Sequence, residues 1–368
     1  MRDQHPPSSA VEALDRLLSQ AADLRASDLH LDVDRNGGMQ ARIRRDGVLQ
    51  PLDTPTELDG IAMAGRAKYL AGLRSYESAL PQEGRIPADA TPVGRELRVA
   101  TYPTLDGEKI VFRIFAEQAV ATLKELELPP ETQTVLANAV TQPDGLILLT
   151  GPAGSGKTTT IYACLKSLAE TGQRHILTIE DPVERRVEGI MQTQIRPEVG
   201  LDFANALRHL LRQDPQVIVL GEIRDDETAR MAVRSAFTGH LVIGTLHAGS
   251  CRGVVERLLD MVEDRYAALA CLRLVVNQRL VRRLCPVCGG PGCNECLETG
   301  FRGRIPIAEF AAFDDDLRKR IRTEGTEGIR PQEPLHANAR RRVREGVTSN
   351  DEISRLLGTP KTTRRPAP

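Results

Sequence analysis

The stretch "LILLTGPAGSGKTTTIYACL", residues 146–165, joins an apolar run to a glycine-rich loop and then to a helix-like tail. The loop fits the pattern G-x-x-x-x-G-K-[ST], and a strand before it and a helix after it supply the context that this pattern requires. Glycines let backbone N–H groups surround phosphate oxygens, and a helix N-terminus adds partial positive charge. The alternative is a glycine-rich turn with an exposed lysine. The residues expected to bind a nucleotide are Gly151, Gly154, Ser155, Gly156, Lys157, Thr158 and Thr159.

The same pattern predicts what the loop holds. Lys157 is expected to reach the β- and γ-phosphates of ATP, and Thr158 is expected to bind Mg²⁺.

Short apolar segments without alternation surround this loop in the sequence, and helix-length segments separate them. Continuous apolar strands that alternate with helices predict a parallel sheet covered on both faces, and hence an α/β fold. The segments lie at 146–150, 175–180, 217–223 and 241–246.

Residues 29–115 show a different pattern, with short alternating segments and one helical segment at about 58–72. The turn signal "RNGG" joins two of the segments, so we expect a small α+β domain with an antiparallel sheet. The segment "EQAVATLKELELPPETQ" predicts a connector with a short helix. After about residue 303 the chain is expected to be polar and helical.

Acidic and histidine side chains follow three of the apolar segments. Glu180 and Asp181 come after one predicted strand, Glu222 after another, and His247 after a fourth. Because ligands sit at the carboxyl ends of parallel strands, these side chains are expected to converge on the glycine-rich loop. A carboxylate there can position or deprotonate water, and His247 can contact a γ-phosphate. The alternative for each carboxylate is a helix cap or a solvated turn; His240, which precedes its strand, is expected to be structural.

A cysteine cluster, "CPVCGGPGCNEC", places two C-x-x-C pairs four residues apart. Thiolates at this spacing can close a tetrahedral Zn²⁺ site, and the intervening glycines allow a tight turn. The alternatives are a reduced surface loop or two strained disulfides. The expected zinc ligands are Cys285, Cys288, Cys293 and Cys296.

Composition limits the partners of the chain. Its 368 residues carry a net charge of −1, contain no Trp and are only 3 % aromatic, which disfavours a stacking platform for nucleic acid. No apolar run reaches the roughly 18 residues that a membrane span needs, so a cytoplasmic protein is expected. A nucleic-acid ATPase remains the alternative because of the run "ARRRVREG", with Arg340, Arg341, Arg342 and Arg344. A binding module with an inactive site is a third possibility, against which Lys157, Glu180 and Glu222 argue.

Together these segments resemble the secretion-motor ATPase family, which comprises type II secretion ATPases and type IV pilus assembly and retraction ATPases. Its Walker A loop is similar to "GPAGSGKTTT", its Asp box to "TIEDPVE" and its His box to "TGHLVIGTLHA". Its Walker B segment resembles "LRQDPQVIVLGEIRDDETA", with Gly221 where other P-loop proteins place Asp. The N-terminal matches are "ASDLHLD", "RIRRDGVL", "PQEGRI" and "RVATYPTLDGEKIVFRI".

The resemblance implies a hexameric cytoplasmic ATPase that powers assembly of a type II secretion pseudopilus or a type IV pilus. It implies a platform protein of the inner membrane as partner, with no nucleic acid. The implied domains are a PAS-like domain at 10–117, a connector at 118–144, a RecA-like ATPase core at 145–284, a zinc element at 285–303 and a C-terminal helical region at 304–360.

Residue roles also follow from the resemblance. Glu222 would be the catalytic base or water-polarising residue, and Glu180 a second carboxylate near the metal. Arg98 and Arg113 of the N-terminal domain would swing onto the phosphates, with Arg85 and Arg95 as less certain additions.

Two features distinguish this chain within the resemblance. A tetracysteine element is typical of secretion and assembly ATPases and absent from retraction ATPases. Its four-residue spacer departs from the longer spacer of many members. The chain is also expected to lack the extra N-terminal domain by which many assembly ATPases dock.

Overall fold

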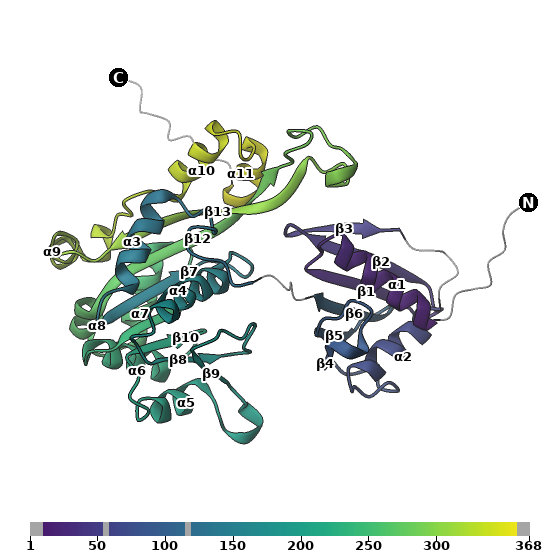
Figure 1. Ribbon diagram of the computed structural model, residues 1–368, viewed down its shortest axis with the longest axis horizontal. Helices are drawn as coiled ribbons and strands as arrows, with labels where there is room; N and C mark the ends of the chain where they lie inside the picture. Colours follow the sequence, from purple (N-terminus) through teal and green to yellow (C-terminus); the bar gives the residue numbers. More distant parts are fainter. Residues whose placement is uncertain (1–9, 54–58, 115–118, 359–368) are drawn as a thin grey trace, which may run out of the picture. The chain divides into compact units, whose positions relative to one another are not determined.

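The computed structural model describes residues 10–53, 59–114 and 119–358. The chain forms two compact units, Met1–Gln118 and Ala119–Pro368 (Figure 1), and each is described by itself. The expected domain boundary at 117/118, the start of the expected connector and the end of the C-terminal region lie outside the described residues.

The N-terminal unit contains a six-stranded sheet with the order β3-β2-β1-β6-β5-β4, and every neighbouring pair is antiparallel. The predicted antiparallel sheet is therefore confirmed, as is the turn at 35–38 between β1 and β2. The strands are β1 (Asp28–Asp34), β2 (Met39–Arg45), β3 (Val48–Leu52), β4 (Gln82–Ile86), β5 (Leu97–Pro103) and β6 (Gly107–Ile114).

Two helices, α1 (Ala10–Asp23) and α2 (Gly60–Leu70), cover one face of this sheet (Figure 1), and a short 3₁₀ turn, η1 (Ala88–Ala90), lies near β4. The buried side chains of α1 recur at helical spacing, so they form a single stripe against the strands. Strand residues alternate between this core and the opposite face. The opposite face of the sheet carries Arg85, Arg98 and Arg113.

The C-terminal unit is built on a seven-stranded sheet with the order β13-β12-β7-β11-β10-β8-β9. All neighbouring pairs are parallel except β12 and β13, which are antiparallel. The strands are β7 (Gly145–Thr150), β8 (Ile176–Glu180), β9 (Met191–Gln194), β10 (Val217–Leu220), β11 (Leu241–Thr245), β12 (Leu272–Leu284) and β13 (Phe301–Ala312).

Helices cover both faces of this sheet, as the apolar strands predict. Leu146 and Leu148 join one core and Ile147 and Leu149 the other, because successive residues of β7 point to opposite faces. The helices are α3 (Pro130–Val140), α4 (Lys157–Thr171), α5 (Phe203–Leu210), α6 (Asp226–Phe237), α7 (Cys251–Met261), α8 (Arg265–Cys271), α9 (Asp315–Glu324), α10 (Leu335–Arg344) and α11 (Asn350–Leu357). Short 3₁₀ turns are η2 (Pro197–Val199), η3 (Asn294–Cys296) and η4 (Gly325–Gly328).

Two expectations about secondary structure are wrong. The region after 303 is not simply helical, because β13 runs to Ala312 beside β12, and both extend as a long hairpin (Figure 1). The described part of the connector before Pro129 forms turns, and the helix there is α3, which begins at Pro130. Proline suits the first position of a helix because its missing N–H has no partner there anyway.

Within the described residues, no helix combines the length and the apolar character that crossing a bilayer requires.

Candidate nucleotide site

The glycine-rich loop joins the fully buried strand β7 to helix α4. Gly151 has φ +143° and Gly156 has φ +88°, conformations that a residue with a side chain rarely adopts. No side chain caps the N-terminus of α4, which begins at Lys157. The first amides of a helix have no partner within the helix, so this loop and helix end offer donors to an anion.

The side chain of Lys157 folds back onto the loop. Its ammonium donates to the carbonyls of Gly151 at 2.8 Å and Pro152 at 3.1 Å. Burial lowers the pKa of Lys157, and the nearby Arg279 charge lowers it further, while Glu222 acts in the opposite direction. Burial, rather than the neighbouring charges, is therefore what makes the ammonium costly here, and an anionic ligand would offset that cost.

Glu222 lies just beyond β10 and is bound on both carboxylate oxygens. Arg224 donates to one oxygen at 2.7 Å, and His247 Nε2 lies 3.0 Å from the other. The second ring nitrogen of His247 lies 3.3 Å from the carbonyl oxygen of Gly151. The structure therefore brings the residues after β10 and β11 to the glycine-rich loop, at the carboxyl edge of the sheet.

Glu180, the last residue of β8, is buried and held by three side chains. Tyr162 and Thr178 donate to it through their hydroxyls, and Gln192 donates through its amide at 3.1 Å. Burial and the neighbouring Glu180 raise the pKa of Tyr162, which keeps its hydroxyl protonated and donating. Gly221 lies close to this strand, since a Cβ there would lie 3.3 Å from the Cα of Glu180, a tight contact.

Strand β12 adds polar side chains that the sequence analysis missed. Asn277 donates to the carbonyl of Gly249 at 3.1 Å, and Arg279 donates to the Asn277 oxygen at 2.7 Å. Gln278, between them, donates to the carbonyl of Ser155 in the loop. The only signal in the sequence is a polar triplet inside an otherwise apolar segment, "LVVNQRLV".

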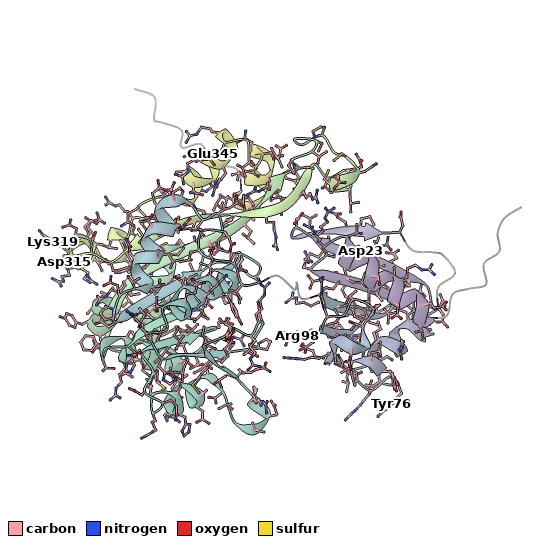
Figure 2. The ribbon with its side chains drawn as sticks, in the orientation of Figure 1. Asp23, Tyr76, Arg98, Asp315, Lys319 and Glu345 are labelled. Carbon is pink, nitrogen blue, oxygen red and sulfur yellow. The ribbon has the colours of Figure 1, made fainter. Side chains whose placement is uncertain are left out.

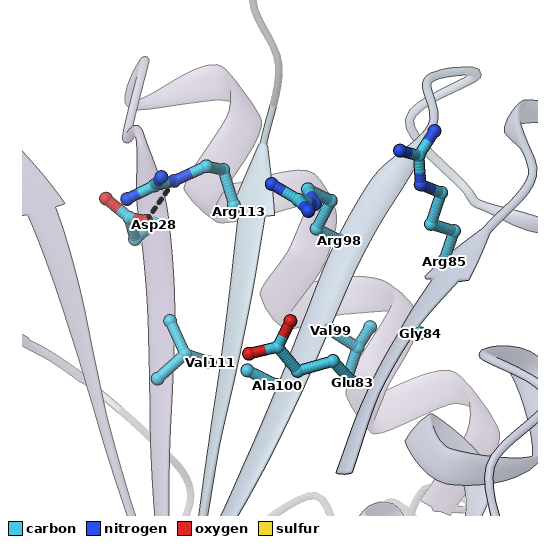
Figure 3. A pocket seen from close by; sticks show the side chains of 9 residues that line it. All are labelled: Asp28, Glu83, Gly84, Arg85, Arg98, Val99, Ala100, Val111 and Arg113. Atoms are coloured by element: carbon cyan, nitrogen blue, oxygen red, sulfur yellow. Dashed lines mark hydrogen bonds and ion pairs between the residues drawn. The ribbon is translucent and has the colours of Figure 1, made fainter. Parts of the chain in front are cut away.

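Three arginines form a cross-strand row on the uncovered face of the N-terminal sheet (Figure 3). Arg85 faces Arg98, Arg98 faces Arg113, and Arg113 faces Asp28. Arg113 is paired with Asp28 at 3.0 Å, and Glu83 lies in the next row. These five side chains help to line a cavity of about 360 Å³.

The arginines of this row differ in their partners. Arg85 is paired with Glu96 at 3.1 Å, whereas no ion pair or hydrogen bond joins Arg98 to any described residue. Figure 2 shows Arg98 projecting from its strand. Arg95 precedes β5 and is not among the residues that line the cavity. His240, expected to be structural, lies at the opposite end of β11 from His247, with Nδ1 2.9 Å from the carbonyl of Ser235.

The four cysteines gather at the tip of the β12–β13 hairpin, with their sulfur atoms within 4.8 Å of one another. Three of the Sγ–Sγ distances are 3.9, 3.9 and 3.7 Å. A tetrahedral zinc–thiolate site with bonds of about 2.3 Å has edges of about 3.8 Å. The cysteines are free, so disulfides are absent, and the donor set fits a closed zinc site. Gly289, Gly290 and Gly292 have positive φ, as the turn between the pairs requires.

The arginine run in α10 is engaged in contacts within the protein. Arg341 is paired with Glu131 at 3.3 Å and Glu333 at 3.0 Å. Arg342 is paired with Glu345 at 3.2 Å and also donates to a backbone carbonyl. These contacts explain part of the run without a nucleic-acid ligand.

Comparison with known proteins identifies the family to which this chain is similar. The family model described as "Type II/IV secretion system protein" matches residues 3–355. The chain is 37 % identical to type II secretion system protein E of Pseudomonas aeruginosa, over 97 % of this chain and 77 % of the relative. It is 36 % identical to type II secretion system ATPase E of Vibrio cholerae, over 94 % of this chain and 75 % of the relative.

The fold also matches a solved structure, the ATPase DotB of Legionella pneumophila. The TM-score is 0.74 at 22 % identity, covering 97 % of this chain and 98 % of that chain. At this identity the likeness concerns the fold. The match to the family model over nearly the whole chain and the identity to curated members agree with the motifs in the sequence. The chain therefore belongs to the type II/IV secretion system protein family, the secretion-motor ATPases.

Proposed function

We propose that this protein hydrolyses ATP and converts the free energy into assembly of a type II secretion pseudopilus or a type IV pilus. The observation that carries the proposal is the meeting of an uncapped, lysine-bearing loop with Glu222 and His247 at one edge of the sheet. The name of the Vibrio cholerae relative, an ATPase of type II secretion, supports the same activity.

In this proposal the loop amides and the N-terminus of α4 bind the phosphates of ATP. Lys157 exchanges its two carbonyl partners for phosphate oxygens, a change that its flexible stem permits. Its lowered pKa reflects a charge that burial makes costly, and a polyanion offsets that cost. The Ser155 hydroxyl is buried without a hydrogen-bond partner, so it is available to a ligand.

Glu222 is proposed to polarise or deprotonate the water that attacks the γ-phosphorus, giving ADP and phosphate. His247, which links this carboxylate to the loop, is proposed to contact the γ-phosphate. Mg²⁺, when bound with ATP, would neutralise phosphate charge; Thr158 would hold it, with Glu180 as the second carboxylate nearby.

Arg98 and Arg113 are proposed to supply positive charge to the phosphates from the N-terminal unit. Arg98 has no anionic partner in the described residues, so its guanidinium is available for this role. Charge delivered by a mobile domain couples hydrolysis to movement because it stabilises the transition state only when the domain is in place.

We propose that Cys285, Cys288, Cys293 and Cys296 bind structural Zn²⁺, because their sulfur geometry matches a tetrahedral site.

We further propose a homo-hexamer in the cytoplasm, held at the inner membrane by a platform protein. Its PAS-like N-terminal domain, 10–117, would join through the connector, 118–144, to a RecA-like core, 145–284, the zinc element, 285–303, and the C-terminal region, 304–360.

The proposed activity is tested by Lys157→Ala. The change removes the ammonium at the loop, so we expect Mg·ATP binding more than about tenfold weaker and hydrolysis lost. The matched control is Lys166→Ala on α4, whose ammonium donates to the backbone of Val120, away from the loop. Isothermal titration and phosphate release measure both effects. Unchanged binding and turnover in Lys157→Ala would contradict the proposed site.

A further inference from the structure

We propose that Gln278 of β12 is a positioning residue for the nucleotide site. It fixes the peptide between Ser155 and Gly156, so that the Gly156 N–H faces the phosphates. This inference rests on the proposed function, since it concerns how the same loop binds its ligand.

Gln278 lies on the strand directly beside the one that enters the loop. Asn277 is in register with Thr150, the last residue of β7, so Gln278 runs past the start of the loop. The Gln278 side chain is buried, with 2 % exposure. A position 122 residues further along the chain than Gly156 thus becomes an immediate neighbour of the loop, which local sequence cannot indicate.

Both ends of the Gln278 amide make hydrogen bonds to this segment. Nε2 donates to the Ser155 carbonyl at 2.9 Å, and Oε1 accepts from the Thr160 hydroxyl at 2.9 Å. A carbonyl can only accept, so the orientation of the amide is fixed by chemistry. One side chain therefore joins the loop to the first turn of α4.

The hydrogen bond to the Ser155 carbonyl also sets the direction of the Gly156 N–H, because both groups belong to one peptide. A trans peptide is planar, and its C=O and N–H point in opposite directions. Anchoring the Ser155 carbonyl toward β12 therefore directs the Gly156 N–H away from β12, toward the inside of the loop. Gly156 has φ +88°, and because glycine has no Cβ it can adopt other backbone conformations, so an anchor is needed to hold this one.

Close packing supports the same role. A Cβ on Gly156 would lie 2.7 Å from Gln278 Nε2, and a Cβ on Gly151 would lie 2.3 Å from the Gln278 carbonyl oxygen. The approach of β12 thus requires glycine at 151 and 156, independently of any ligand. The strand presses against the outer side of the loop and leaves its inner side for the ligand.

The first test replaces Gln278 with Leu, which keeps most of the volume and removes both hydrogen bonds. We expect binding of the fluorescent nucleotide mant-ADP with Mg²⁺ to weaken about tenfold, because the peptide is no longer held. The matched control is Val281→Ala, a buried position three residues along β12 that packs with Ile305 and Ile307 rather than with the loop. KM for ATP should rise in Gln278→Leu far more than kcat falls.

A second variant, Gln278→Glu, separates positioning from packing and serves if Gln278→Leu does not fold. A buried carboxylate facing the Ser155 carbonyl cannot donate until it is protonated. Burial at this position raises its pKa, while the nearby cations Lys157 and Arg279 act in the opposite direction. The ratio of its dissociation constant to that of the wild type, measured at each pH, should fall as the pH is lowered from about 8 to 6. A loss of packing alone would give a ratio independent of pH.

The outcomes separate this inference from the proposed function. If the wild type binds no mant-ADP, the proposed function fails, and the inference fails with it. If the wild type binds and Gln278→Leu matches Val281→Ala, the inference alone is overturned. A pH-independent defect in Gln278→Glu would also overturn the positioning role.

Discussion

At the scale of single residues, the proposed chemistry depends on Glu222. Both of its oxygens are held by partners, Arg224 and His247, and an amide could keep contacts with both. Glu222→Gln should therefore fold and bind ATP within a few-fold of the wild type, while kcat falls by roughly 10²–10⁴. Filter binding of labelled ATP and phosphate release measure the two effects.

The control for this substitution is Asp226→Asn, an exposed carboxylate in the first turn of α6, four residues further on. It should retain the wild-type kcat. Turnover of Glu222→Gln at the wild-type rate would show that another group activates water.

A second residue-scale prediction concerns Glu352, a fully buried carboxylate in α11. Burial alone would raise its pKa, but Arg355 and Arg282 outweigh burial and lower the pKa to about 2. The stability that it contributes is therefore complete above the unfolded-state pKa of about 4.3 and is lost as the pH falls toward 2. At neutral pH, Glu352→Gln should cost a few kcal/mol.

Urea unfolding of the wild type and of Glu352→Gln between pH 6 and 2.5 checks this linkage. The difference in unfolding free energy should shrink steadily below about pH 4.5. A difference that stays constant over this range would show that the carboxylate is not held in its charged form.

At the level of elements, the four cysteines proposed to bind zinc lie at the end of the β12–β13 hairpin. Two strands that extend beyond a sheet have few neighbouring strands to stabilise them. A metal bound by Cys285, Cys288, Cys293 and Cys296 would hold their ends together. The double variant Cys285→Ser, Cys288→Ser should lose one equivalent of zinc and melt several degrees lower. Elemental analysis and calorimetry measure both changes.

The control replaces the buried Cys164 with Ser; this cysteine is outside the cluster. It should keep its zinc. Full zinc content together with unchanged melting in the double variant would contradict a structural site.

The elements that sequence could predict are those with a local cause. β7, β8, β10 and β11 are continuous apolar runs because helices cover both faces, and the loop glycines are a local demand of backbone conformation. β12 and β13 were missed because their polar residues are satisfied by distant partners. Gln278, for example, bonds to Ser155 and Thr160, and nothing near it in the sequence records this.

The candidate site also contains residues that the sequence could place and partners that it could not. Lys157, Glu180, Glu222 and His247 could be placed together because parallel strands deliver their carboxyl ends to one edge. The partners that hold them could not, since Tyr162 and Gln192 reach Glu180 only after the chain has packed. The row of Arg85, Arg98 and Arg113 needs the register of three strands.

For the molecule as a whole, we propose that Arg98 reaches ATP only when movement of the N-terminal unit delivers it there. Arg98→Ala should therefore leave nucleotide affinity within a few-fold of the wild type and reduce kcat at least about tenfold. Arg85→Ala, whose arginine is already paired with Glu96, is the matched control and should lose less activity. Equal losses of kcat in Arg98→Ala and Arg85→Ala, measured by steady-state kinetics, would contradict a special role for Arg98.

The proposed protein is a motor that hydrolyses ATP as a hexamer. Its most direct test is the ATPase rate per subunit measured against protein concentration, with mass determined by light scattering on the same samples. We expect a rate that rises as hexamers form and falls on dilution. A rate independent of assembly, or one that appears only when DNA is added, would contradict it.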